Sequence, residues 1–356
     1  MVAKTNYLEI KNLGINLGDF ILSNISFSLK KGEMLILLGH SGSGKSTIIR
    51  LISGLLKPDE GEININEKNI INVKTYKRNF GLVFQDFALF PHLTVSENIA
   101  FGLKIKKMSK NEIQKKISYF LEMVGLKGYQ DRKIEMLSGG EKQRVALART
   151  LAPEPDLILF DEPLSALDEN MRLNLRKEIK RIQKKLHFTG IFVTHDRKEA
   201  FELGDKIALI SNGKMLQFGE PKSLYLNPKT PEVAEFIGIN NNFSGQIIHY
   251  EKNLKIAEMN KIKIEFESNI DFELDEKIRI YIKSELCFFS NEKSEKNCFE
   301  TKITKITDYG QNIEVITYLG KNVLKIPMLR PNMTLDELFQ MKYLTIPIQS
   351  INVFRR

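Results

Sequence analysis

Short, continuous hydrophobic runs and longer amphipathic stretches alternate along the first two thirds of the chain. The hydrophobic runs occupy residues 34–38, 81–84, 157–160, 191–194 and 207–210. Unbroken Leu, Ile, Val and Phe runs are typical of strands in a parallel sheet, because helices cover both faces of such a sheet. Apolar residues at helical spacing occupy residues 46–56, 110–124, 140–151 and 172–186. The pattern therefore predicts an α/β arrangement.

The pattern changes after about residue 230. Ile262, Ile264 and Phe266 alternate with polar residues, as in strands that have one buried face. Turn residues near 308–310 and 319–321 separate further short segments, which predicts a small β-barrel domain with one short helix near its end, at 334–339. We therefore predict an α/β domain, a linker and a smaller β-rich domain, at residues 1–235, 236–242 and 243–356.

Composition restricts the classes of protein to which the chain can belong. Its 356 residues suffice for two domains with separate cores, and 42% hydrophobic residues is usual for a globular protein. No apolar run approaches the roughly 20 residues of a membrane-spanning helix, and the first residues lack the apolar core of a signal peptide. Cys287 and Cys298 form no disulfide framework or metal-binding pattern, which favours the reducing cytosol. The net charge of +9 comes from lysines spread along the chain, so we expect no nucleic-acid binding.

A glycine-rich loop follows the first of these predicted strands and precedes a helical stretch. Its residues fit the phosphate-binding pattern G-x-x-x-x-G-K-[ST]: Gly39, His40, Ser41, Gly42, Ser43, Gly44, Lys45 and Ser46. The glycines let backbone N–H groups surround phosphate oxygens, and the positive end of the helix dipole adds to the attraction. We expect Lys45 to contact the β- and γ-phosphates of ATP and Ser46 to bind Mg²⁺. Thr47, the next residue, is a further predicted contact of the nucleotide.

A pair of carboxylates, Asp161 and Glu162, ends the apolar strand at 157–160. This position places both side chains at the carboxyl edge of the predicted sheet, where open α/β sheets bind their ligands. Asp161 is suited to holding Mg²⁺, and Glu162 to activating the attacking water as a general base. Together with the phosphate loop, the pair predicts ATP hydrolysis.

Residues 137–144 read Leu-Ser-Gly-Gly-Glu-Lys-Gln-Arg and mark a second exposed helix start. This stretch, with Ser138, Gly139 and Gly140, resembles the LSGGQ signature of ATP-binding-cassette (ABC) proteins. Three further residues resemble functional residues of that family and occur in the family's order: the Q-loop glutamine, the D-loop aspartate and the switch histidine, here Gln85, Asp168 and His195.

The resemblance implies a P-loop NTPase domain with a helical subdomain at about residues 86–155. It also implies a homodimer in which two copies meet head to tail, so that ATP lies between the phosphate loop of one copy and Ser138 and Gly140 of the other. His195 would hold the γ-phosphate. Gln85 would bind Mg²⁺ and couple the site to a partner.

The sequence departs from the family at three places. Leu17 stands where relatives place an aromatic residue that stacks on adenine, and Phe20 or Tyr7 are the candidates to replace it. His40 replaces a common proline, at a position that contributes its backbone. Glu141 stands where many relatives have glutamine, a variation that the family tolerates.

The segment after Gln85 resembles importer ATPases, which dock separate membrane permease subunits there. Its apolar residues Phe87, Leu89, Phe90 and Leu93 would line that groove. The later part of the chain resembles the OB-like TOBE domain of importers. The resemblance therefore implies a peripheral ATPase on the cytoplasmic face of the membrane. A solute-binding protein would be its indirect partner.

The solute is predicted less directly, because other subunits select it. Residues 17–20 are most similar to importers of molybdate or tungstate, while ferric iron, polyamines and sugars are the alternatives. Two other classes compete with an importer: a soluble ABC ATPase that acts on ribosomes or DNA, and a module that binds ATP without turnover. The single ATPase domain argues against a ribosome- or DNA-acting ATPase. Intact Lys45, Glu162 and His195 argue against a module without turnover.

Overall fold

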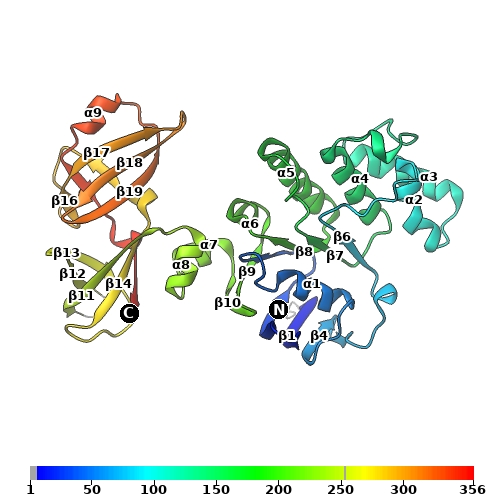
Figure 1. The fold of residues 1–356 in the computed structure, drawn as a ribbon, viewed down its shortest axis with the longest axis horizontal. Helices are drawn as coiled ribbons and strands as arrows, with labels where there is room; N and C mark the ends of the chain where they lie inside the picture. Colours follow the sequence, from blue (N-terminus) through cyan, green and yellow to red (C-terminus); the bar gives the residue numbers. More distant parts are fainter. Residues whose placement is uncertain (1–5, 252–253) are drawn as a thin grey trace, which may run out of the picture. The chain divides into compact units, whose positions relative to one another are not determined.

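The computed structural model describes residues 6–251 and 254–356. The chain divides into two compact units, of which the first ends at Leu224 and the second begins at Tyr225 (Figure 1). Residues 225–235, which the sequence assigned to the α/β domain, therefore pack within the second unit. The predicted linker at 236–242 is also partly regular, because helix α8 (Pro231–Ile237) and strand β11 (Asn241–Glu251) extend into it.

The first unit is built around a six-stranded sheet in the order β10-β9-β3-β8-β7-β6. Its strands are β3 (Met34–Leu38), β6 (Phe80–Val83), β7 (Leu157–Asp161), β8 (Thr189–Thr194), β9 (Lys206–Ser211) and β10 (Lys214–Gly219). All neighbours are parallel except β10, which pairs antiparallel with β9. The five hydrophobic runs of the sequence are the five parallel strands, and every residue of β3 and β8 is buried.

A second, antiparallel sheet in this unit was not predicted. It has the order β2-β1-β4-β5, formed by β1 (Leu8–Asn16), β2 (Ile21–Leu29), β4 (Glu60–Ile65) and β5 (Lys68–Asn69). Helix α1 (Lys45–Ser53) shares one hydrophobic core with both sheets. The phosphate loop that precedes α1 is thereby fixed at both of its ends.

The remaining helices of this unit agree with the predicted stretches to within a few residues, and α2 and α6 are additional. They are α2 (Val95–Ile105), α3 (Lys110–Met123), α4 (Gly139–Leu151), α5 (Glu169–Leu186) and α6 (Arg197–Leu203). Helices α2, α3 and α4 gather beside the sheet (Figure 1). A capping box starts each of these three, which explains where each helix begins.

The second unit contains α8, the last residues of α7 (Pro221–Leu226), and several antiparallel sheets. A five-stranded sheet has the order β13-β12-β11-β14-β21, with β12 (Leu254–Met259), β13 (Ile262–Glu267), β14 (Lys277–Ile282) and β21 (Ile351–Arg355). Two three-stranded sheets have the orders β15-β20-β16 and β17-β18-β19. Their strands are β15 (Phe288–Ser290), β16 (Cys298–Glu300), β17 (Lys302–Asp308), β18 (Asn312–Leu319), β19 (Asn322–Leu329) and β20 (Tyr343–Thr345). All three sheets and α9 (Leu335–Phe339) contribute to one hydrophobic core.

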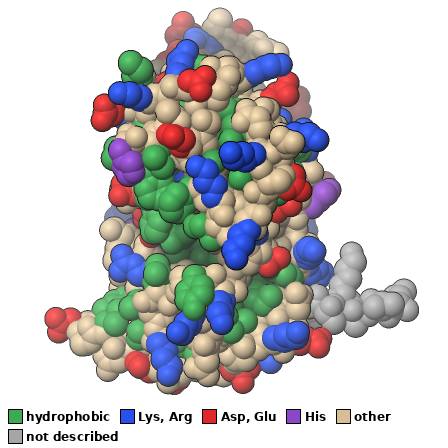
Figure 2. Space-filling view, turned by 90° about the vertical axis from the view of Figure 1, so that its right-hand side faces the viewer, with side chains coloured by type: hydrophobic (Ala, Val, Ile, Leu, Met, Phe, Trp, Pro, Cys, Tyr) green, Lys and Arg blue, Asp and Glu red, His purple; other side chains and the backbone are tan. Residues whose placement is uncertain are grey.

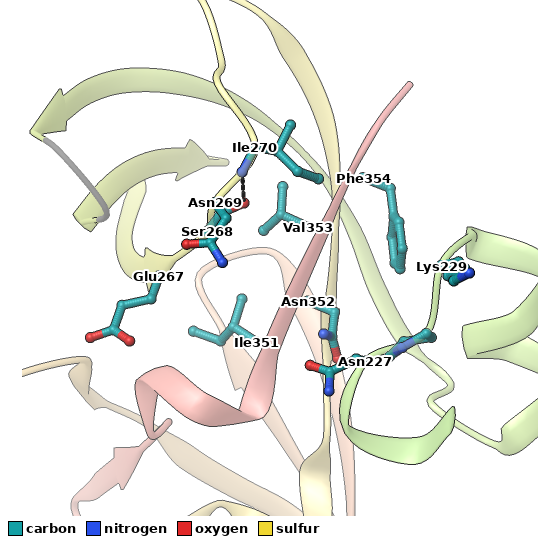
Figure 3. Close-up of a pocket in the computed structure, with 11 residues that line it drawn as sticks. Asn227, Lys229, Glu267, Ser268, Asn269, Ile270, Ile351, Asn352, Val353 and Phe354 are labelled. Carbon is teal, nitrogen blue, oxygen red and sulfur yellow. Dashed lines mark hydrogen bonds between the residues drawn. The ribbon is translucent and has the colours of Figure 1, made fainter. Parts of the chain in front are cut away.

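The five-stranded sheet leaves its two outer strands, β13 and β21, unpaired with each other. A cavity of about 700 Å³ lies between the residues that follow β13, strand β21 and the loop after α7 (Figure 3). In Figure 3, Ile351 and Val353 lie on one side of β21, and Asn352 and Phe354 lie on the other, as strand periodicity requires. The second unit is therefore built mainly of antiparallel sheets, one of which has an open edge.

Lys283, just after β14, is a buried cation in this unit. The residue is only 1% exposed, and its ammonium donates to the carbonyl of Leu226 at 3.0 Å. The amide of Asn352 donates to the same carbonyl at 3.3 Å, and the hydroxyl of Tyr281 donates to Glu235 at 2.6 Å. These bonds hold residues 225–235 against the β-sheets. Burial lowers the pKa of Lys283 to about 8.

This burial predicts a pH-dependent stability. Below pH 8 the ammonium is charged in both the folded and the unfolded state, and its burial opposes folding. Between about pH 8 and 10.5 only the unfolded state keeps the proton, so stability rises with pH. We expect Lys283→Met to be more stable than the native chain at pH 7, with the difference reduced by about 1 kcal/mol at pH 9. Thermal unfolding of both proteins at the two pH values measures this difference. A constant difference would contradict the proposed cause.

Candidate functional site

The glycine-rich loop lies between the end of β3 and the start of α1, as predicted. Gly44, the residue before the helix, has φ of 105°, in the left-handed region that glycine adopts readily. A Cβ atom at this position would lie 2.7 Å from the ring of Phe20, so glycine is also required by the space available. The loop conformation therefore depends on the residue type that the motif specifies.

Lys45 is folded back over its own loop. The residue is 4% exposed, and its ammonium donates to the carbonyls of Gly39 at 2.9 Å and His40 at 2.7 Å. Burial lowers the pKa of Lys45, while Glu162 and Asp161 act in the opposite direction. The ammonium is thus held beside the loop and within the electrostatic influence of Asp161, at the end of β7, and Glu162, which follows it.

Ser46 and Asp161 meet at the same edge of the sheet. The Ser46 hydroxyl donates to a carboxylate oxygen of Asp161 at 2.7 Å, although the two residues are separated by 115 positions. A hydroxyl and a carboxylate are both oxygen donors of the kind that Mg²⁺ accepts. In the described part of the chain, no group of three or more His, Cys, Asp and Glu side chains could hold a metal. The pair therefore fits a Mg²⁺ ion that takes its other ligands from phosphates and water.

Glu162 and His195 face each other beside this pair. A carboxylate oxygen of Glu162 lies 3.7 Å from Nδ1 of His195, which follows β8 and has a side chain that is 58% exposed. Glu162 has φ of 46°, an uncommon conformation for a residue other than glycine. Its carbonyl accepts a hydrogen bond from Ser165 at 2.9 Å, which holds the turn. The predicted base and the predicted switch histidine are brought together.

A cavity of about 190 Å³ opens over the loop. It is lined by Phe20, Ser41, Gly42, Gly44, Lys45, Ser46, Thr47 and Glu162. Pockets that enclose a small ligand usually have volumes of about 300–1,000 Å³. The open, small cavity is consistent with a loop that forms only part of a nucleotide site.

The other predicted residues lie outside this cavity. Ser138 begins α4 in a capping box: Glu141 accepts the backbone N–H of Ser138 at 2.8 Å and the hydroxyl of Tyr129 at 2.9 Å. These two hydrogen bonds lower the pKa of Glu141. Asp168 caps α5, accepting from the N–H of Met171 at 2.9 Å. Gln85 is exposed after β6. Of these residues, Glu141 has a structural role in the capping box, and its negative charge strengthens the hydrogen bonds that it accepts.

The candidates for the adenine contact are separated by the structure. Tyr7 is buried, and its hydroxyl donates to the carbonyl of Asp156 at 2.9 Å, so its ring belongs to the core. Leu17 is exposed and does not line the cavity over the loop. Phe20 does line it. Of the three candidates, only Phe20 therefore borders the cavity over the loop.

The segment after β6 contains a contact that sequence reasoning missed. Phe87 and Ala88 both have positive φ, of 65° and 45°. Arg149 of α4 donates to the carbonyls of both, at 3.0 Å and 2.6 Å, and its guanidinium lies 5.6 Å from the ring centre of Phe90. The helix that begins at Ser138 therefore holds the turn that follows Gln85. No sequence pattern indicates the contact between Arg149 and Ala88, because 61 residues separate them.

The four apolar residues predicted to line a docking groove are all partly buried. Phe90 packs on Phe101 of α2 with 4.5 Å between ring centres, and Phe101 and Ile105 are themselves exposed. On the face that carries α2, α3 and α4, hydrophobic side chains gather between Lys and Arg side chains (Figure 2). Part of the apolar surface of α2 is therefore left exposed.

Known proteins resemble this chain in sequence and in fold. A family profile described as "ABC transporter" matches residues 22–165. The chain is 39% identical to the spermidine/putrescine import ATP-binding protein PotA of Mycoplasma capricolum, covering 89% of this chain and 90% of that protein. Proteins of the same name in Borreliella afzelii and Clostridioides difficile are 44% and 40% identical, over 78% and 87% of this chain and 80% and 88% of theirs. The solved structure of cbiO1 from Clostridium perfringens, part of the ABC transporter complex cbiONQ, has a TM-score of 0.58 and 30% identity. The match covers 65% of this chain and 98% of that one.

The position of Phe20 predicts how the base is recognised. Stacking of a base on an aromatic ring is worth about 1–3 kcal/mol, so Phe20→Ala should weaken ATP binding by roughly 5- to 150-fold. Binding of tripolyphosphate, which has no base, should change little. Titration of both ligands measures the contrast, with Leu17→Ala as the matched control. Equal weakening of both ligands would show that Phe20 supports the loop instead of the base.

Proposed function

This chain belongs to the ABC transporter family as an importer-type ATP-binding subunit, and from that premise we propose that it energises the uptake of polyamines. Its activity is that of an ABC-type transport ATPase. The observation that carries the proposed solute is the similarity to spermidine/putrescine import proteins over 78–89% of the chain. It favours the polyamine alternative over the molybdate or tungstate that residues 17–20 suggested. It also favours an importer over a factor acting on ribosomes or DNA.

The phosphate loop binds the nucleotide through groups that are already in position. The Lys45 ammonium would exchange its bonds to two loop carbonyls for phosphate oxygens. Ser46 and Asp161 would hold Mg²⁺, which neutralises charge on the phosphates. Gln85 would join them after a movement of its segment, since it is exposed and lies outside the cavity.

Glu162 is the proposed general base. Its carboxylate borders the cavity beside Lys45 and can accept a proton from the attacking water. His195 lies 3.7 Å from that carboxylate and would hold the γ-phosphate through a hydrogen bond. The uncommon backbone conformation of Glu162, fixed by Ser165, aims its side chain into the site.

The complete site is proposed to need a second copy of the chain. The cavity over the loop is small and open, and Ser138, Gly139 and Gly140 do not line it. Ser138 and Gly139 are exposed at the start of α4, where the positive end of the helix dipole would attract a phosphate of another molecule, while the N–H of Ser138 is already bonded to Glu141. Asp168, at the start of α5, would lie near that interface.

The partners in the membrane are permease subunits, as an importer ATPase requires. Among the described residues, no helix combines the length and the hydrophobicity needed to cross a bilayer. We propose that the chain works at the cytoplasmic face and that the permease binds the apolar residues between Phe87 and Ile105. A solute-binding protein would then act on the complex indirectly.

The role of Glu162 predicts a separation of binding from turnover. Glu162→Gln keeps the size of the side chain but removes the base, so kcat should fall by about 100- to 10,000-fold. Affinity for ATP should stay within about twofold, because the loop and Lys45 are intact. Steady-state hydrolysis and nucleotide titration measure the two quantities, and Glu154→Gln, a surface carboxylate of the same unit, is the control. An unchanged kcat would refute the assignment.

The proposed solute is tested by transport. Cells that express the chain with its permease and solute-binding partners should take up labelled spermidine or putrescine but not molybdate. Lys45→Ala should abolish this uptake, because it removes the charge that meets the phosphates. Uptake of molybdate in place of polyamines would contradict the proposed solute while leaving the ATPase assignment intact.

A further inference from the structure

A cluster of charged side chains lies directly behind Glu162 and His195. It is formed where the turn after β7, the first turns of α5 and the turn between β8 and α6 approach one another, and α5 packs on α6 (Figure 1). A small cavity of about 10 Å³ is enclosed there. Its lining includes Glu162, His195, Arg172 and Glu199. The cluster therefore adjoins the catalytic residues without belonging to the nucleotide cavity.

Arg172 of α5 connects both turns. One terminal nitrogen donates to the carbonyl of Leu167 at 3.0 Å, directly before Asp168. The other lies 3.7 Å from a carboxylate oxygen of Asp196, directly after His195. A single guanidinium thus contacts the neighbours of two residues that are proposed to meet the nucleotide. A planar group with fixed nitrogen positions is suited to setting such a spacing.

Arg172 also lies 3.5 Å from the exposed carboxylate of Glu169 on its own helix, but its partner Glu199 is fixed. Glu199 is 5% exposed, accepts a hydrogen bond from the Thr194 hydroxyl at 2.5 Å, and lies 3.8 Å from Nε of Arg172. Burial raises the pKa of Glu199. Within the described residues, that Nε has no hydrogen-bond partner although it is buried. Glu199 and Nε of Arg172 are therefore too far apart for a hydrogen bond, and a shift of the turn by about 1 Å would allow one to form.

We propose that Arg172 is a positioning residue for hydrolysis, which acts through His195 by setting the distance between the Asp168 turn and the His195 turn. The inference rests on the proposed ATPase site. Arg172 does not line the nucleotide cavity, so its role is the placement of groups that do.

The variants separate this role from a structural one. Arg172→Gln should lower kcat by about 10- to 100-fold, because small displacements of catalytic groups have effects of this size. Affinity for ATP should stay within about twofold, because the phosphate loop is unaffected. Arg172→Lys keeps the charge but not the fork and should have an intermediate kcat. Arg181→Gln is the control, since Arg181 lies on the same helix and bonds the carbonyl of Met123 instead.

Combination with His195→Ala decides whether Arg172 acts through the histidine. If it does, Arg172→Gln/His195→Ala should be no slower than His195→Ala alone, within about twofold. Multiplied rate losses, or a loss of kcat only in proportion to a lowered melting temperature, would overturn the inference. If Arg172→Gln does not fold, the same comparison with Arg172→Lys applies. Absence of hydrolysis in both the native chain and Arg181→Gln would instead refute the ATPase site and, with it, this role.

Discussion

The hydrogen bond between Ser46 and Asp161 shows the constraint on which the site depends. Strands β3, β8 and β7 are neighbours in a parallel sheet, so the segments that follow them emerge at one edge. The loop after β3 supplies Lys45 and Ser46, that after β7 supplies Asp161 and Glu162, and that after β8 supplies His195. Residues far apart in the sequence therefore converge without any specific long-range motif. The strand order alone accomplishes this.

The parallel strands and the phosphate loop could be predicted because each is encoded locally. A continuous apolar run identifies a strand buried on both faces, and the loop residues are contiguous. Strands β1, β2 and β4 escaped prediction because their register is interrupted, between Ile10 and Leu13 for example, and their apolar residues do not alternate regularly. The start of the second unit was placed too late, because Lys283 and Tyr281 hold the preceding helices through contacts that no local pattern records.

The site residues divide in the same way. Positions defined by a motif could be assigned from contiguous residues, whereas the place of Phe20 beside the loop and the contacts of Arg149 are recognisable only through their neighbours in space. Two departures from the family have physical explanations. His40 contributes its carbonyl to Lys45, which any residue can do, and Glu141 closes a capping box more strongly as an anion than a glutamine would. The solute could not be derived, because none of the site's residues would touch it.

The Lys45 ammonium rests on two carbonyls of its own loop, and this has a kinetic consequence. These two hydrogen bonds tie the loop to its own lysine, so the loop need not become ordered when ATP arrives. Capture of ATP then requires only an exchange of hydrogen bonds at a preformed surface. Its rate should be governed by diffusional encounter, and the slow events of the cycle should come after binding.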